Sequence, residues 1–188
     1  MRNNSKNKIT ISALEELLSQ AKSKQAIISI AHTCGDNGNP LLKLSLHEDA
    51  NIAAKASWVF RTWAEMHPKE AKNSTEKVIS VLQCSNLDPV LRNILGAVYD
   101  NGFPKKFETI FIDICLGLNL ERNRAVAVHC NALGILIDLS KKHPALRIEV
   151  ELALERSQIE NTAAFSAQLK KLRKIAKPDQ KSINKWNL

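Results

Sequence analysis

Three stretches of the chain repeat one pattern: 52–68 (IAAKASWVFRTWAEMHP), 90–102 (VLRNILGAVYDNG) and 128–144 (VHCNALGILIDLSKKHP). Their first residues lie 38 positions apart, and so do many positions inside them. The register that begins at Ala56 continues with Ile94 and Ala132, so each of its members is apolar. Within each stretch apolar residues recur every three or four positions, which is the period of an α-helix. The sequence therefore predicts one helix that occurs three times at a fixed spacing.

Caps and breaks divide the rest of the chain into further helices. Two of the repeated helices end at Pro68 and Pro144, because proline cannot donate to the helix ladder. A first helix is expected to begin at a cap formed by Thr10 or Ser12. The third repeated helix is expected to run over residues 121–142. The remaining periodic segments predict helices at about 23–33, 40–46, 74–82, 104–118, 145–156 and 162–175.

A short helix followed by a long one recurs with the period of about 38 to 40 residues that is typical of HEAT-type repeats. One such pair cannot bury its apolar side alone, so successive pairs must stack. We therefore expect an all-α fold, a HEAT-like superhelix (solenoid) of about ten helices. Residues 10–176 would form this single domain, between polar, basic and flexible tails at 1–9 and 177–188.

The repeated helices also carry a family resemblance, and its blocks are 53–59 with 65–70, 91–95, and 124–128 with 141–144. They resemble small bacterial HEAT-like repeat proteins of unassigned function, over roughly residues 10–176. Some members are labelled adenylosuccinate lyase. That superfamily has a Ser-Ser-x-Met-Pro-x-Lys-x-Asn loop, whereas Met66 is followed here by His67. The resemblance thus implies a fold, and we do not expect lyase activity.

Basic residues are concentrated near the C-terminus. Residues 166–188 contain seven of the 27 Lys and Arg residues but one of the 19 Asp and Glu residues, so the preceding part is almost neutral. Four of these lysines lie at helical spacing: Lys170, Lys171, Lys174 and Lys177. Such a stripe can contact the phosphates of a nucleic acid, since each neutralised phosphate releases counterions. A solvated tail is the alternative interpretation.

No pattern in the sequence indicates a metal, a cofactor or a membrane segment. The cysteines lie in apolar runs without metal-ligand spacing, so we expect buried free thiols in a reducing cytoplasm: Cys34, Cys84, Cys115 and Cys130. The longest uncharged stretch, 125–137, is shorter than the ~20 residues of a membrane span. The N-terminal residues also lack an apolar signal region. These features predict a soluble, cytoplasmic protein without metal or cofactor.

One enzymatic alternative comes from residue types. The common nucleotide-binding, serine-nucleophile and zinc-protease motifs are absent from the sequence. HEAT-like alkylpurine DNA glycosylases, however, line a concavity with Trp, Tyr, Arg and a catalytic Asp. The repeated helices carry similar residues: Trp58, Arg61, Trp63, Tyr99, Asp100 and Asp138. Aromatic groups that stack on a base beside a carboxylate would suit that chemistry.

Simpler roles are also open to these residues. Trp58 shares its register with Gly96 and Gly134, so it is expected in the core, where small residues let helices approach closely. Asp100 lies where a helix is expected to end. Asp138 is placed to pair with Lys142, four residues further along the same helix.

A binding surface is the interpretation that the sequence favours. In HEAT arrays the second helix of each pair tends to line the concave side. The polar residues there are candidates for contact with a protein or peptide: Lys55, Arg61, Arg92, Asn93, His129, Asn131 and Asp138. A solvated helix face is the alternative for each of them. The expected function is thus non-catalytic protein interaction, with nucleic-acid binding as the alternative.

Overall fold

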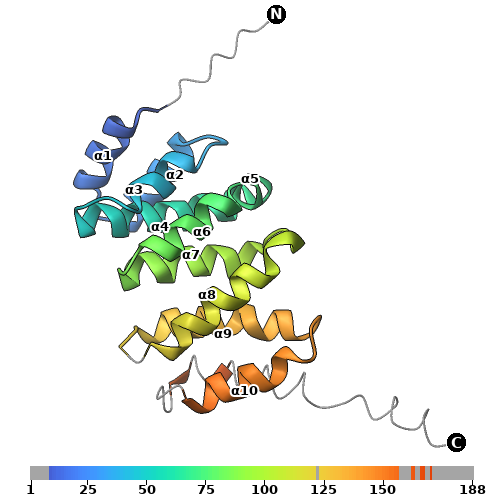
Figure 1. Cartoon of the computed structure of the whole chain (residues 1–188). Helices are drawn as coiled ribbons and strands as arrows, with labels where there is room; N and C mark the ends of the chain where they lie inside the picture. The colour runs from blue at the N-terminus through green and yellow to red at the C-terminus, as the bar shows by residue number, and fades with distance from the viewer. Residues whose placement is uncertain (1–8, 122, 157–161, 164–165, 168–169, 171–188) are drawn as a thin grey trace, which may run out of the picture. The chain divides into compact units, whose positions relative to one another are not determined.

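The computed structural model describes residues 9–121, 123–156, 162–163, 166–167 and 170 (Figure 1). This part of the chain contains ten α-helices, one short 3-10 helix and no strand. The all-α prediction is therefore confirmed. The predicted helix at 162–175 lies largely outside the described residues, as do the predicted tails at 1–9, apart from Ile9, and 177–188.

The chain divides into two compact units, Met1–Phe107 and Glu108–Leu188, here called unit 1 and unit 2. Unit 1 contains α1 (Ile11–Gln20), α2 (Lys24–Thr33), α3 (Asn39–Leu44), α4 (Ala50–Met66), α5 (Pro68–Asn73), α6 (Thr75–Cys84), α7 (Asp88–Asn101) and the 3-10 helix η1 (Lys105–Phe107). Unit 2 contains α8 (Glu108–Leu120), α9 (Val126–Ser140) and α10 (Leu146–Arg156).

The repeat predicted from the sequence is visible in the helix boundaries. The long helices α4, α7 and α9 begin at Ala50, Asp88 and Val126, which are 38 positions apart. The register of Ala56, Ile94 and Ala132 is fully buried in all three. Since α4 packs against α1, α2, α3, α5 and α7, it is the central helix of unit 1.

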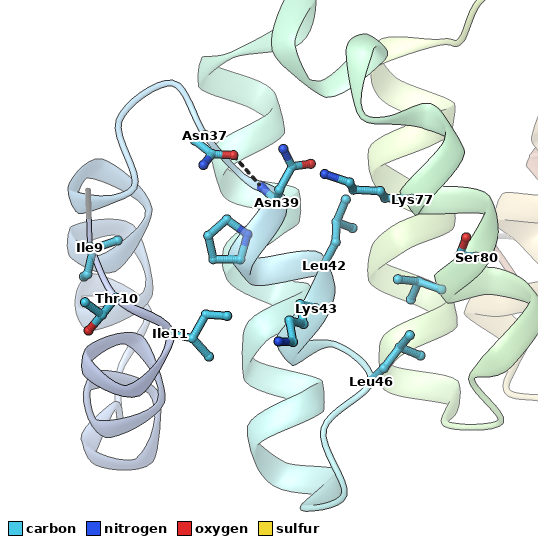
Figure 2. Close-up of a pocket in the computed structure, with 12 residues that line it drawn as sticks. Ile9, Thr10, Ile11, Asn37, Asn39, Leu42, Lys43, Leu46, Lys77 and Ser80 are labelled. Carbon is cyan, nitrogen blue, oxygen red and sulfur yellow. Dashed lines mark hydrogen bonds between the residues drawn. The ribbon is translucent and has the colours of Figure 1, made fainter. Parts of the chain in front are cut away.

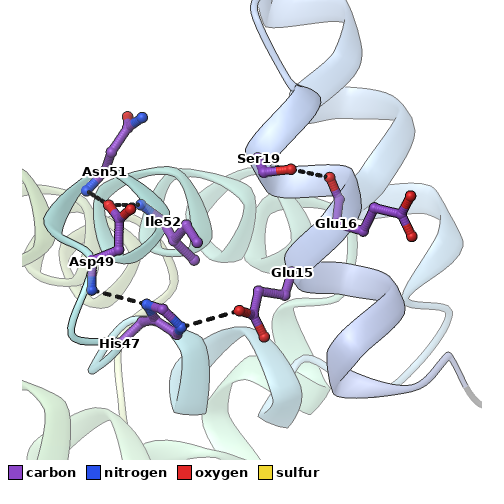
Figure 3. Close-up of polar contacts among 7 residues, drawn as sticks. All are labelled: Glu15, Glu16, Ser19, His47, Asp49, Asn51 and Ile52. Atoms are coloured by element: carbon purple, nitrogen blue, oxygen red, sulfur yellow. Dashed lines mark hydrogen bonds and ion pairs between the residues drawn. The ribbon is translucent and has the colours of Figure 1, made fainter.

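The connection between α3 and α4 is fixed by hydrogen bonds (Figure 3). The carboxylate of Asp49 accepts hydrogen bonds from the backbone N–H groups of Asn51 (2.7 Å) and Ile52 (3.3 Å), so it caps α4. His47 Nδ1 accepts the N–H of Asp49 at 2.9 Å. Its Nε2 therefore carries the proton and faces Glu15 Oε1 at 3.3 Å. The start of α4 is in this way tied to α1.

Unit 2 is a helix pair, α8 and α9, with α10 packed against both helices. Polar contacts close both ends of the pair. At one end Glu108, with an 8% exposed side chain, accepts from Lys142 Nζ at 2.7 Å and lies 2.9 Å from His143 Nε2. These two bonds hold the pKa of Glu108 below its usual range, against the opposing effect of burial. At the other end His129 Nδ1 lies 3.4 Å from Asn119 Oδ1, and both side chains are buried.

Two predicted helix ranges were wrong, and one helix was not predicted. The third long helix begins at Val126 and not at residue 121, because Ala125 has an extended backbone (φ −59°, ψ 142°) and precedes the first helical turn. The predicted helix at 104–118 is split into η1 and α8, which continues to Leu120. The six-residue helix α5 was not anticipated; it follows the break at His67, where Pro68 starts a new helix. The first helix, in contrast, has the predicted Thr10 cap, which accepts from the N–H of Ala13.

The cysteines follow the prediction except at one position. Cys34, Cys115 and Cys130 are buried free thiols. Burial raises the pKa of Cys34 to about 11, and it also raises the pKa of Cys115 and Cys130, so these thiols are protonated at neutral pH. Cys84 is exposed, contrary to the prediction, because it ends α6 on the side opposite to the buried Thr75 and Leu82. Among the described residues no helix combines the length and the apolar character that a membrane span requires.

Candidate functional site

The outward side of α4 and α7 presents a mixed aromatic and charged surface in unit 1. We call it the second-helix face and define it by Trp58 and Arg61 of α4 and by Arg92, Tyr99 and Asp100 of α7. Trp58 is 40% exposed, so its predicted place in the core was wrong. The buried side of α4 is formed instead by positions such as Ala56, Phe60 and Trp63.

Gly96 explains why the register of Trp58 misled the sequence analysis. A Cβ atom on Gly96 would lie 2.6 Å from the guanidinium carbon of Arg61. The small residue therefore accommodates an arginine side chain from the neighbouring helix, and not a close approach of backbones. Arg61 crosses Gly96 and pairs with Asp100, with 2.9 Å between Nη2 and Oδ2.

Two predicted binding residues connect helices within unit 1. Lys55 Nζ donates to the backbone carbonyls of Leu18 (3.0 Å) and Ser19 (3.2 Å), near the end of α1. Asn93 is 5% exposed, and its side-chain amide donates to the hydroxyl of Ser57 at 3.1 Å. The prediction that Asn93 lies on an open face was therefore wrong: its hydrogen bond to α4 allows a polar group to be buried.

The other predicted binding residues belong to α9 in unit 2. His129 is 3% exposed and faces Asn119, so its predicted place on an open face was wrong as well. Asn131 is half-buried. Asp138 accepts from Lys141 Nζ at 2.6 Å and not from the predicted Lys142, which pairs with Glu108.

The residues of the glycosylase hypothesis divide into different roles. Trp63 is fully buried, and its indole Nε1 donates to the carbonyl of Gly35 at 2.8 Å. Its ring stacks on His67 (5.2 Å between centroids) and fills the space where a Cβ on Gly38 would lie, 2.5 Å from ring carbons. Trp63 therefore holds the loop that follows α2 and offers no surface for a base. Asp100 is already paired with Arg61.

Of the predicted basic stripe, only Lys170 lies within the described residues, where it is exposed. Lys171, Lys174 and Lys177 lie outside them.

A second feature of unit 1 was missed by the sequence analysis. A cavity of about 700 Å³ lies across α3, between the N-terminal end of α1 and α6 (Figure 2). Its apolar lining consists of Ile9, Ile11, Pro40, Leu42, Leu46 and Val81. We call it the first-helix groove. Leu46 was the residue that could have indicated this groove. An apolar side chain just beyond the end of a short helix is not covered by a further turn of that helix, and Leu46 is exposed.

The fold and these surfaces define a class, the all-α proteins built from repeated helix pairs. The profile described as HEAT repeat domain matches residues 14–175, which is far more than half of the chain. The chain therefore belongs to the HEAT repeat family. No curated protein and no solved structure matches the chain.

Proposed function

We propose that this HEAT repeat protein is a non-catalytic binding protein and that the second-helix face of unit 1 contacts another protein or a peptide. The observation that carries the proposal is Trp58, a tryptophan 40% exposed on the central helix of the unit. Tryptophan, tyrosine and arginine are the residue types most enriched among the energetically dominant residues of protein interfaces. Trp58 lies three positions before Arg61 on α4, and Arg61 pairs with Asp100 of α7, the helix that carries Arg92 and Tyr99.

The polar contacts on this face support recognition and argue against catalysis. The Arg61–Asp100 pair is partly exposed, at 33% and 39%, so a partner can desolvate it without opening the core. A glycosylase would need its carboxylate available to a sugar, whereas Asp100 accepts from an arginine. We therefore propose that the protein releases no methylated base from DNA. Release by the intact protein in a base-release assay would overturn this part of the proposal.

The binding role is tested by paired variants. The parent chain, Trp58→Ala and Leu17→Ala are each used to capture partners, and the captured protein is then purified. Leu17 is a matched control because it is 38% exposed on a different helix, α1. The affinity for the purified partner should fall about tenfold or more for Trp58→Ala and remain unchanged for Leu17→Ala. Equal affinity of the parent and Trp58→Ala would refute the assignment of this face.

A nucleic-acid partner is distinguished by its salt dependence. If the captured partner is DNA or RNA, binding should weaken steeply as salt rises, in proportion to the number of phosphates contacted. Binding of this kind that is unchanged in Trp58→Ala would assign the function to the basic C-terminal stripe instead.

A further inference from the structure

The first-helix groove arises from the length of one helix. α3 has six residues, whereas its neighbours α1 and α6 have ten each. At about 1.5 Å per residue, α3 is therefore roughly 6 Å shorter than either neighbour. α3 contacts both of them, and apolar surface beyond its last turn is left uncovered. Leu46 is the clearest of these, with 44% of its surface exposed.

The charges at the groove have one sign. Lys43 of α3 and Lys77 of α6 line it, and no acidic residue does so. Figure 2 shows the two lysines at different places along the groove: Lys77 extends toward Asn39, and Lys43 lies nearer to Ile11 and Leu46. Within the described part of the chain, neither ammonium group has a hydrogen-bond or ion-pair partner. The groove therefore combines apolar walls with two available positive charges.

We propose that the first-helix groove binds an acidic amphipathic peptide segment of a partner protein. Apolar side chains of the segment fill the space around Leu42 and Leu46, and its carboxylates pair with Lys43 and Lys77. Two cations on different helices fit a segment with several acidic residues better than a molecule with a single acidic head group. The chain's own terminal segments outside the described residues, 1–8 and 171–188, are rich in Lys and Arg, so charge excludes them as the favoured occupant.

The proposal is tested with a synthetic probe and the full chain. The probe is a fluorescently labelled peptide of about 14 residues with Leu at helical positions i, i+3, i+4 and i+7 and Glu elsewhere. A matched peptide carries Lys in place of every Glu. The acidic peptide should bind saturably in fluorescence anisotropy, and the basic peptide should bind at least tenfold more weakly. Equal binding of the two peptides, or no binding of the acidic one, would overturn the proposal.

Two double variants then locate the site. Lys43→Glu/Lys77→Glu should weaken binding of the acidic peptide about tenfold or more, because both favourable charge contacts become repulsive. Lys69→Glu/Lys72→Glu makes the same change in net charge at two exposed positions of α5 outside the groove, so it should leave the affinity unchanged. All four positions sit at the surface of the helices, and circular dichroism checks that both variants fold. Equal effects of the two double variants would mean that only overall charge matters.

Two further measurements separate the alternatives. Carbodiimide coupling of the bound acidic peptide should link its carboxylates to Lys43 or Lys77, as mapped by mass spectrometry. Links confined to other lysines would contradict the assigned site. Dodecanoate is added as a competitor, and binding of dodecanoate without binding of the peptide would assign the groove to a small anion and refute the proposal. Trp58→Ala should not change the affinity for the peptide, so this test is independent of the second-helix face.

Discussion

Units 1 and 2 are stabilised by polar contacts of different kinds. In unit 1 the contacts join successive elements of the repeat: Lys55 reaches α1, Asn93 reaches α4, and Arg61 reaches α7. In unit 2 they close the two ends of one helix pair, through Glu108 at one end and Asn119 at the other. Apolar repetition is shared by both units, whereas polar repetition is not. The difference shows that the fold depends on the apolar registers and that polar residues adapt to local neighbours.

The register of Asp100 illustrates the same point. Asp100 and Asp138 occupy equivalent positions of α7 and α9. Asp100 pairs with Arg61 of the preceding long helix, but the position equivalent to Arg61 in the next copy is Tyr99. Tyrosine carries no positive charge, and Asp138 accepts from Lys141 of its own helix.

The largest expected loss of stability comes from substituting one of the two tryptophans of α4. Trp63→Ala should destabilise unit 1 by about 3–5 kcal/mol, because it removes a fully buried ring and leaves a cavity. The hydrogen bond to the carbonyl of Gly35 is lost as well. Chemical denaturation measures the free energy of unfolding. Amide hydrogen exchange should show lost protection at residues 24–38 before residues 108–140.

Trp58→Ala is the matched control on the same helix. Its side chain is 40% exposed, so the free energy of unfolding should change by less than about 1 kcal/mol. A loss comparable to that of Trp63→Ala would mean that Trp58 belongs to the core, as the sequence first suggested.

Glu108→Gln should weaken the polar contacts that close one end of the α8–α9 pair in unit 2. Glu108 is the first residue of α8 and accepts charge-assisted hydrogen bonds from residues just beyond α9. The substitution removes the negative charge and one of the two acceptor oxygens. It should cost about 2 kcal/mol at pH 7, in the lower part of the range for bonds to charged groups, because the side chains of Lys142 and His143 are 64% and 44% exposed. Urea denaturation of the parent and the variant gives the difference.

The stability difference between the parent and Glu108→Gln should also depend on pH. The folded pKa of Glu108 is below its usual value, so its contribution to stability is complete above the unfolded pKa of about 4.3. The contribution is lost as the pH falls through the folded pKa. The difference in stability between the parent and Glu108→Gln should therefore shrink below about pH 4. A difference that grows with acidity would contradict this account.

Asn93→Ala tests a contact between successive long helices. The substitution removes the hydrogen bond to the Ser57 hydroxyl, which is fully buried but still donates to the carbonyl of Ala54. Because Ser57 keeps one partner, the expected loss is about 1 kcal/mol of the free energy of unfolding. Asn51→Ala, at an exposed position of α4, is the control and should have little effect. If Asn93→Ala lowers the free energy of unfolding no more than Asn51→Ala does, the hydrogen bond of Asn93 does not stabilise unit 1.

These residues also show how far the sequence could lead. The apolar register of Ala56, Ile94 and Ala132 predicted the repeat, because burial of one helix side imposes a period that the sequence displays. The burial of Asn93 depends on a hydroxyl on another helix, which no local pattern displays. The groove depends on where α1 and α6 lie relative to the end of α3, and hence on tertiary packing.

The smallest expected effect concerns Gly96. Alanine at this helical position should add about 1 kcal/mol through helix propensity. In the parent its Cβ displaces the guanidinium of Arg61, which weakens a partly exposed ion pair worth about 0.5 kcal/mol, so the net gain is about 0.5 kcal/mol. In an Arg61→Ala background these guanidinium atoms are absent, and the full ~1 kcal/mol should appear. A double-mutant cycle from urea denaturation therefore gives a coupling of about 0.5 kcal/mol between positions 61 and 96. Equal gains in the two backgrounds would show that Gly96 does not serve the arginine that crosses it.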